Sequence, residues 1–180
     1  MPRFSFRTPL VVIAIVLSTI LPAMAEQKDY TFEKPVKHLA LLIANWDYDG
    51  GSLPGTELDQ KEMKARLERL NFKVQVLSNF RNRDELIESL NPFLEQVQFG
   101  DFVVVYYSGH GLGYSAENYL VPTKLPKQIQ KDKFFDYFFS AEDIQRQIQI
   151  RQAGISLVIF DACRTFNTPE LINTTNEPSE

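Results

Sequence analysis

The sequence predicts an α/β fold built on a mostly parallel, doubly wound sheet. Two observations support this prediction: short apolar runs recur along the chain, and segments with helix-start signals lie between them. Nearly continuous apolar strands are typical of parallel sheets covered on both faces. Strands that alternate with helices pack as a layered sheet with right-handed crossovers.

The expected strands are runs of β-branched, aromatic and aliphatic residues. They cover residues 39–44, 72–77, 102–107 and 155–160. A fifth, shorter strand is expected over 118–121, outside the main sheet. Residues 134–139 are strongly aromatic and should pack on the sheet or on a partner.

The expected helices open with a polar residue followed three positions later by an acid. This capping pattern satisfies free N–H groups in a first helical turn. It occurs at Thr56-x-x-Asp59, Asn82-x-x-Glu85 and Ser140-x-x-Asp143, each ahead of apolar residues at helical spacing.

The N-terminus has the pattern of a secretory signal. Arg3 and Arg7 precede an apolar run over 10–21, and small residues follow at 23–25. The run is too short for a membrane span, which needs roughly 20 helical residues. We therefore expect a signal peptide over 1–25 and a periplasmic or secreted protein, with membrane contact only through an uncleaved signal.

The remaining chain divides by composition. Residues 26–37 are polar and predict an N-terminal arm or linker, and residues 38–166 predict one domain. Residues 167–180 are rich in Asn, Thr, Glu, Pro and Ser, which indicates a disordered tail.

Composition argues against several functions. With 19 basic and 23 acidic residues, the chain has no excess of positive charge for nucleic acid. Two histidines and one cysteine cannot supply three or four nitrogen and sulfur ligands, so no metal or other cofactor is expected. Asp47-x-Asp49-Gly50 is similar only to the start of a calcium loop, which makes calcium a minor alternative.

Two predicted strands run directly into polar residues. Ser108-Gly109-His110-Gly111 follows one, and Asp161-Ala162-Cys163-Arg164 follows the other. Ligands bind beyond the carboxyl ends of parallel strands, so His110 and Cys163 should meet there. Cys163 is the only cysteine; a lone thiol in an exported protein is either buried and inert or kept for its reactivity.

These motifs resemble those of the caspase, paracaspase and metacaspase superfamily, especially its bacterial caspase-like members. The resemblance rests on Tyr-Tyr-Ser-Gly-His-Gly at 106–111 and Phe-Asp-Ala-Cys-Arg at 160–164. The His precedes the Cys by about 50 residues, as in caspases. Over residues 38–166, the resemblance implies a caspase-like three-layer sandwich and a cysteine endopeptidase that acts on proteins or peptides.

The resemblance also implies catalytic roles. Cys163 is the expected nucleophile, and His110 the base that passes a proton to the leaving amine. The main-chain N–H groups of Gly111 and Cys163 are the expected oxyanion hole. The alternative for His110 is a histidine that only fills the core.

Two acids carry the expected substrate preference. Asp161 lies where metacaspases and paracaspases have an acid in the pocket for a basic side chain, and Asp59 matches a second acidic position in metacaspases. This implies cleavage after Arg or Lys, because carboxylates pair well with guanidinium. The alternative for Asp59 is a plain helix cap.

Caspase-like proteins have two further strands after the catalytic Cys. Residues 164–180 contain no comparable apolar run, so we expect the last strands to be lacking and the sheet to have an open edge. Three explanations stay open: a truncated gene, a partner chain that completes the sheet, or a catalytically inactive interaction module.

Overall fold

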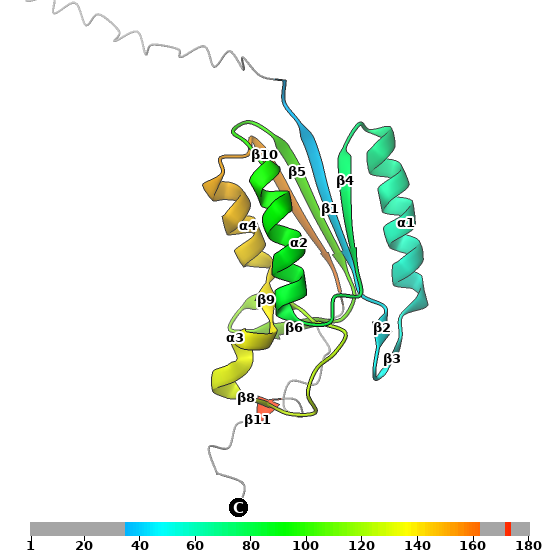
Figure 1. Ribbon diagram of the computed structural model, residues 1–180, viewed down its shortest axis with the longest axis vertical. Helices are drawn as coiled ribbons and strands as arrows, with labels where there is room; N and C mark the ends of the chain where they lie inside the picture. Colours follow the sequence, from blue (N-terminus) through cyan, green and yellow to red (C-terminus); the bar gives the residue numbers. More distant parts are fainter. Residues whose placement is uncertain (1–34, 163–171, 174–180) are drawn as a thin grey trace, which may run out of the picture. The chain divides into compact units, whose positions relative to one another are not determined.

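The structure is a computed structural model that describes residues 35–162 and 172–173. Its centre is a sheet of four parallel strands in the order β10-β5-β1-β4 (Figure 1). The strands are β1 (His38–Ala44), β4 (Lys73–Ser78), β5 (Phe102–Ser108) and β10 (Ile155–Asp161). Each agrees within about a residue with a predicted apolar run, so the expected parallel sheet is confirmed.

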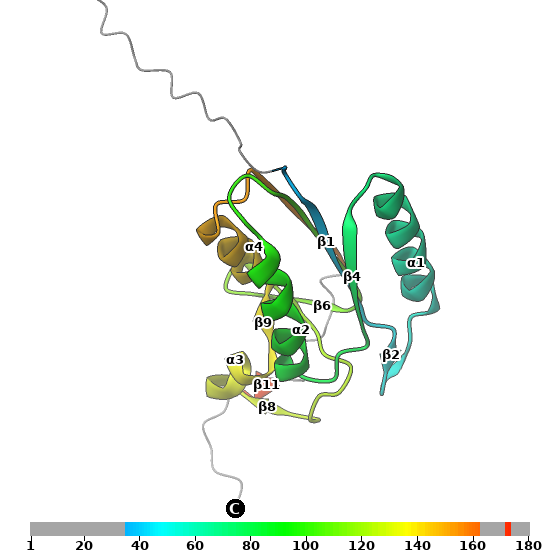
Figure 2. The same ribbon diagram turned by 45° about the horizontal axis from the view of Figure 1, so that its top comes forward.

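Helices cover the sheet from both sides. Helix α1 (Pro54–Arg69) lies on one face, and α2 (Arg83–Gln96) and α4 (Ala141–Ile150) lie on the other (Figures 1 and 2). The described part of the chain is therefore the three-layer sandwich that the sequence predicts.

Strand β1 shows how the two faces are filled. Leu39, Leu41 and Ile43 belong to the core beneath α2 and α4, whereas Ala40 and Leu42 belong to the core beneath α1. Each of these side chains is at most 2% exposed. Burying one large aliphatic side chain contributes roughly 1.5–3 kcal/mol, so this strand is a major source of stability.

Two of the three predicted helix caps are present. The Asn82 side chain accepts a hydrogen bond from the Glu85 N–H at 2.9 Å, and Ser140 accepts one from the Asp143 N–H at 2.9 Å. The third prediction, a cap at Thr56, is wrong: α1 begins earlier, after Leu53, without a side-chain cap. Pro54 starts the helix because its fixed φ suits the first turn and it has no N–H to satisfy.

Small strands lie beyond the carboxyl ends of the parallel strands (Figures 1 and 2). An antiparallel sheet contains β6 (Gly111–Tyr114), β7 (Glu117–Leu120) and β9 (Phe139–Ser140). A hairpin of β2 (Asp47–Tyr48) and β3 (Gly51–Ser52) follows β1. The strand predicted over 118–121 is thus confirmed as β7, one residue earlier.

The aromatic segment packs on the small sheet. It follows the 3-10 helix η1 (Lys131–Lys133) and forms the short α3 (Phe134–Tyr137). Phe134 and Phe138 are buried with Leu112 and Tyr119, whereas Phe135 is 60% exposed. The cluster is therefore a second core that supports β6 and β7.

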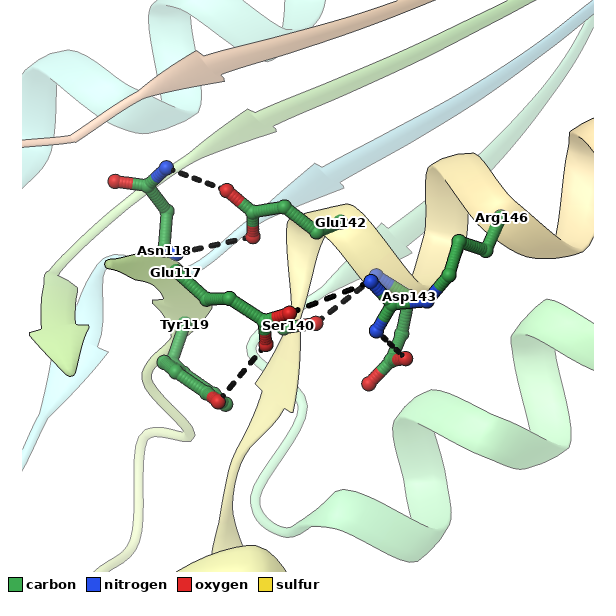
Figure 3. Close-up of polar contacts among 7 residues, drawn as sticks. All are labelled: Glu117, Asn118, Tyr119, Ser140, Glu142, Asp143 and Arg146. Carbon is green, nitrogen blue, oxygen red and sulfur yellow. Dashed lines mark hydrogen bonds and ion pairs between the residues drawn. The ribbon is translucent and has the colours of Figure 1, made fainter. Parts of the chain in front are cut away.

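A polar network joins β7 to α4 (Figure 3). The main-chain N–H and side-chain amide of Asn118 donate to the Glu142 carboxylate at 3.0 and 2.7 Å. Arg146 donates to Glu117 at 3.3 Å and also pairs with Asp143. These contacts fasten the small sheet to the helix that follows it.

Strand β10 is the edge of the main sheet within residues 35–162 and 172–173. It pairs with β5 alone, and on the α1 side Ile155 is 57% and Leu157 is 47% exposed. Among the described residues no strand pairs with the other side of β10; the expectation that the last strands are lacking concerns residues 164–180, of which only 172–173 are described.

Part of the chain expected to be a disordered tail carries one short strand. β11 (Ile172–Asn173) pairs in parallel with β8 (Ile129–Gln130). The predicted signal peptide, most of the predicted arm, Cys163 and Arg164 lie outside the described residues. Among the helices that are described, none is long and apolar enough to cross a membrane.

Asn45 gives a test of this fold. Its buried side chain donates to the Val121 carbonyl at 2.8 Å and accepts from the Phe80 N–H at 3.0 Å. We predict that Asn45→Ala lowers the free energy of unfolding by about 1–3 kcal/mol, because a buried N–H loses its acceptor. Urea unfolding measures this change.

The matched control is Arg146→Gln, which breaks only exposed ion pairs. It should cost less than about 1 kcal/mol. Equal losses in both variants would contradict the assigned role of Asn45.

Candidate functional site

The candidate site lies where β5 and β10 end. The two strands pair in register, so Tyr107 lies opposite Phe160 and Ser108 lies opposite Asp161. The Tyr107 and Phe160 rings contact each other with centroids 5.2 Å apart. The residues that follow, Gly109 to Gly111 on one strand and Ala162 on the other, therefore meet at one edge of the sheet.

His110 is held through its main chain as well as its ring. Its N–H donates to the Tyr48 hydroxyl at 2.8 Å, and its carbonyl accepts from the Tyr107 hydroxyl at 2.5 Å. The Tyr48 and His110 rings lie 4.4 Å apart between centroids. Burial lowers the pKa of the His110 imidazole below its ordinary value of 6.5, which favours the neutral ring at neutral pH.

Gly111 lies against the end of β10. A Cβ at this position would come within 2.8 Å of both the Ala162 Cβ and the Phe160 ring. The close approach requires glycine and brings the His110 segment to the residue just before Cys163. Cys163 itself, and with it both the nucleophile and one predicted oxyanion donor, lies outside the described residues.

The two predicted specificity acids line one cavity. Asp59, on α1, and Asp161, at the end of β10, border a space of about 340 Å³. Leu53, the first turn of α1, Ser108, Gly109 and Ala162 form the rest of its wall. Within the described part of the chain, neither carboxylate forms an ion pair.

Tyr106 holds the Asp161 carboxylate in place. The Tyr106 hydroxyl donates to one carboxylate oxygen of Asp161 at 3.0 Å, and the tyrosine is 4% exposed. Burial, with the nearby carboxylates of Asp161 and Asp59, raises the pKa of Tyr106 to about 12. The hydroxyl thus keeps its proton at neutral pH and remains a donor to Asp161.

A second cavity is lined in part by His110. Its volume is about 300 Å³, and its lining includes Tyr48, His110, Pro122 and Leu125. Asp49 and Lys127 also border it, and Asp49 pairs with Lys124. This wall is more apolar than the cavity that holds Asp59 and Asp161.

The Asp47–Gly50 segment, considered above for calcium, forms β2 and the turn of the β2–β3 hairpin. Asp49 pairs with Lys124, and the Asp47 main-chain N–H donates to the Asn79 side chain at 3.0 Å. No group of three or more His, Cys, Asp or Glu side chains in the described ranges could hold a metal ion.

Sequence patterns did not identify the three tyrosines of the site. Tyr106 and Tyr107 were expected as strand residues and as part of the motif that contains His110, without a role of their own, and Tyr48 lies within the calcium-like segment. The available signal was a pair of hydroxyl-bearing residues in an otherwise aliphatic strand, because a buried hydroxyl requires a partner. Their partners, His110 and Asp161, could not be deduced from that signal.

Glycine substitutions test the close approach of the two strand ends. We predict that Gly111→Ala lowers the free energy of unfolding by about 1–3 kcal/mol, because its methyl group overlaps Phe160 and Ala162. Gly113→Ala, two residues along the same strand, is the control, since a Cβ there meets nothing within 4 Å. Thermal or urea unfolding of both variants measures the difference, and similar stabilities would refute the assigned contact.

The sequence of this chain is similar to sequences of known proteins. The family model of the Caspase domain matches residues 37–179. The human mucosa-associated lymphoid tissue lymphoma translocation protein 1 is 26% identical over 145 residues, which are 79% of this chain and 17% of that protein. Its mouse homolog is 26% identical over 130 residues, 72% of this chain and 15% of the relative.

The chain thus spans about a sixth of the length of these curated relatives. The family match covers most of the chain, including both predicted motifs and all the strands of the main sheet. On this evidence the chain belongs to the Caspase domain family, a family of cysteine peptidases.

Proposed function

We propose that this protein is a cysteine endopeptidase that uses His110 and Cys163 and cleaves after Arg or Lys. The observation that carries the specificity is the shared cavity of Asp59 and Asp161. The catalytic pair is supported by the strand register, which brings the His110 segment against Ala162, the neighbour of Cys163 in sequence.

The proposed reaction is acyl transfer to a thiol. Neutral His110 takes the proton of the Cys163 thiol, the resulting thiolate attacks the peptide carbonyl carbon, and the main-chain N–H groups of Gly111 and Cys163 stabilise the oxyanion. The C–N bond breaks as protonated His110 gives its proton to the leaving amine. Water then hydrolyses the thioester, with His110 as base, and restores the thiol.

A basic side chain suits the acidic cavity on electrostatic grounds. At an effective dielectric constant of 20, the Coulomb attraction between a carboxylate and a guanidinium 4 Å apart is about 4 kcal/mol, before the cost of desolvation and side-chain ordering. Asp161 has one oxygen bonded to Tyr106, and no hydrogen bond to its other oxygen is found among the described residues. Asp59 and Asp161, which form no ion pair among the described residues, therefore offer acceptors for an Arg or Lys side chain.

The N-terminus of α1 opposes this preference only in part. Leu53 to Thr56 border the same cavity, and a helix N-terminus carries about half a positive unit charge. The two carboxylates outweigh this charge. The helix cap, which was the alternative explanation for Asp59, does not apply, because α1 begins at Pro54 and leaves Asp59 in its second turn.

A second candidate function is that of a caspase-like interaction module without catalysis. The exposed Ile155 and Leu157 on the edge strand favour it, since an open edge can pair with a strand of a partner chain. The two candidates differ at Cys163: a peptidase needs a reactive thiol, whereas an interaction module does not.

Matched fluorogenic peptides test the proposed specificity. We predict that kcat/KM for a peptide ending in Arg exceeds that for the same peptide ending in Asp by roughly 100-fold or more, because the cavity carries two negative charges. Asp161→Asn should lower kcat/KM for the Arg peptide by about 10- to 100-fold, the loss of one charge-assisted hydrogen bond. Asp59→Asn should act in the same direction.

The control for charge is Asp132→Asn, an exposed acid away from the cavity, which should leave kcat/KM unchanged. Cys163→Ala should abolish cleavage. Retained cleavage in Cys163→Ala would refute the mechanism, whereas a preference for the Asp peptide would refute the specificity alone. Absence of cleavage together with an unreactive Cys163 would favour the interaction module.

A further inference from the structure

Tyr48 contacts His110 in two ways. Its hydroxyl accepts a hydrogen bond from the His110 main-chain N–H at 2.8 Å, and its ring lies 4.4 Å from the imidazole, tilted by 49°. One side chain from the β2–β3 hairpin therefore holds both the main chain and the ring of the residue proposed to carry the proton.

Tyr107 binds the main-chain carbonyl of the same residue. Its hydroxyl donates to the His110 carbonyl at 2.5 Å and accepts from the Val121 N–H at 3.2 Å. Burial raises the pKa of both Tyr48 and Tyr107, so both hydroxyls keep their protons at neutral pH. His110 is thus held between two tyrosines that come from different elements.

Gly109 shows how closely the two hydroxyls approach. A Cβ at Gly109 would lie 2.7 Å from the Tyr107 hydroxyl and 2.8 Å from that of Tyr48. Its φ of 156° is also rare for residues with a side chain. The two tyrosine hydroxyls therefore require glycine at the position before His110.

The two tyrosines differ in exposure. Tyr107 is 1% exposed and is part of the main core. Tyr48 is only partly buried, and with His110 it lines the cavity of about 300 Å³. The Tyr48 ring therefore shields part of the imidazole from water, and a change in this side chain should alter the site without disrupting the core.

We propose that Tyr48 is a positioning residue for His110, fixing its main chain through the hydroxyl and its imidazole through the ring. The proposal rests on the proposed function, in which His110 transfers the proton. Loss of the hydroxyl should impair the orientation of the ring during catalysis, and loss of the whole side chain should also expose the imidazole to water.

The pKa of the His110 imidazole reports how far Tyr48 shields it from water. The titratable groups around it in the described structure are Tyr48 on β2, Tyr107 on β5, and Asp49 and Lys127, which border the same cavity. Burial is the cause of the lowered pKa of His110, so removing the covering ring should raise that pKa toward 6.5.

Nuclear magnetic resonance separates the two contributions of Tyr48. The sequence has two histidines, so His38→Gln leaves His110 as the single imidazole to titrate. In this background, Tyr48→Ala should raise the His110 pKa, whereas Tyr48→Phe should leave it unchanged because the ring remains. Tyr48→Phe should speed exchange of the His110 amide hydrogen roughly 10-fold, as expected when a hydrogen bond of about 1 kcal/mol or slightly more is lost.

Peptide cleavage by the full chain gives the functional readout. Tyr48→Phe should lower kcat about 5- to 10-fold with little change in KM, because the hydrogen bond orients His110 and not the substrate. Tyr119→Phe is the matched control: it also loses a bonded hydroxyl, which donates to Glu117 at 3.0 Å in the network of Figure 3, and should leave kcat unchanged.

An unchanged His110 pKa in folded Tyr48→Ala, or an unchanged kcat in Tyr48→Phe, would overturn the proposal. If Tyr48→Ala does not fold, Tyr48→Phe still tests it through amide exchange and kcat. If the wild type cleaves no peptide, the proposed function fails, whereas the imidazole titration and the amide exchange still decide whether Tyr48 positions His110.

Discussion

The parallel pairing of β5 with β10 fixes the position of every other part of the site. Seven residue pairs run in register from Phe102 opposite Ile155 to Ser108 opposite Asp161. Because β5 and β10 end at the same edge of the sheet, the segment around His110 faces the segment that leads to Cys163. A shift of one residue would turn Asp161 to the other face of the sheet, away from α1 and Asp59.

Two groups of tyrosines act on opposite sides of this junction. Tyr106 points to the α1 face and holds Asp161 in the acidic cavity, whereas its neighbour Tyr107 points to the other face and holds His110. Alternation along one strand thus assigns adjacent tyrosines to substrate binding and to proton transfer in the proposed mechanism. The arrangement needs glycine on both sides of His110, because Tyr48 and Tyr107 lie over Gly109, and Phe160 and Ala162 lie over Gly111.

Much of the fold was predictable because its signals are local. The four central strands are apolar runs, and the caps at Asn82 and Ser140 depend on residues three positions apart. The start of α1 was misplaced because Pro54 can begin a helix without a capping side chain, so a capping pattern at Thr56 carried no information there. The β2–β3 hairpin was missed because strands of two residues have no periodicity to detect.

For the site, the sequence predicted the motifs but not the contacts that hold them in place. The motifs at His110 and Asp161 were evident in sequence, and parallel strands explain why they share an edge. The contacts of Tyr48 with His110 and of Tyr106 with Asp161 join residues 62 and 55 positions apart, and no local pattern specifies such pairs. Asn45, whose side chain bonds to Phe80 and Val121, was missed for the same reason.

The proposed peptidase is tested most directly by the rate at which irreversible peptide chloromethyl ketones modify the protein. Peptide mapping then identifies the modified residue. We predict an adduct on Cys163. It should form roughly 100-fold faster with an Arg reagent than with the matching Asp reagent, because the adjoining cavity is acidic. We also predict that His110→Ala slows this reaction. Equal rates with the two reagents, or modification that spares Cys163, would contradict the account.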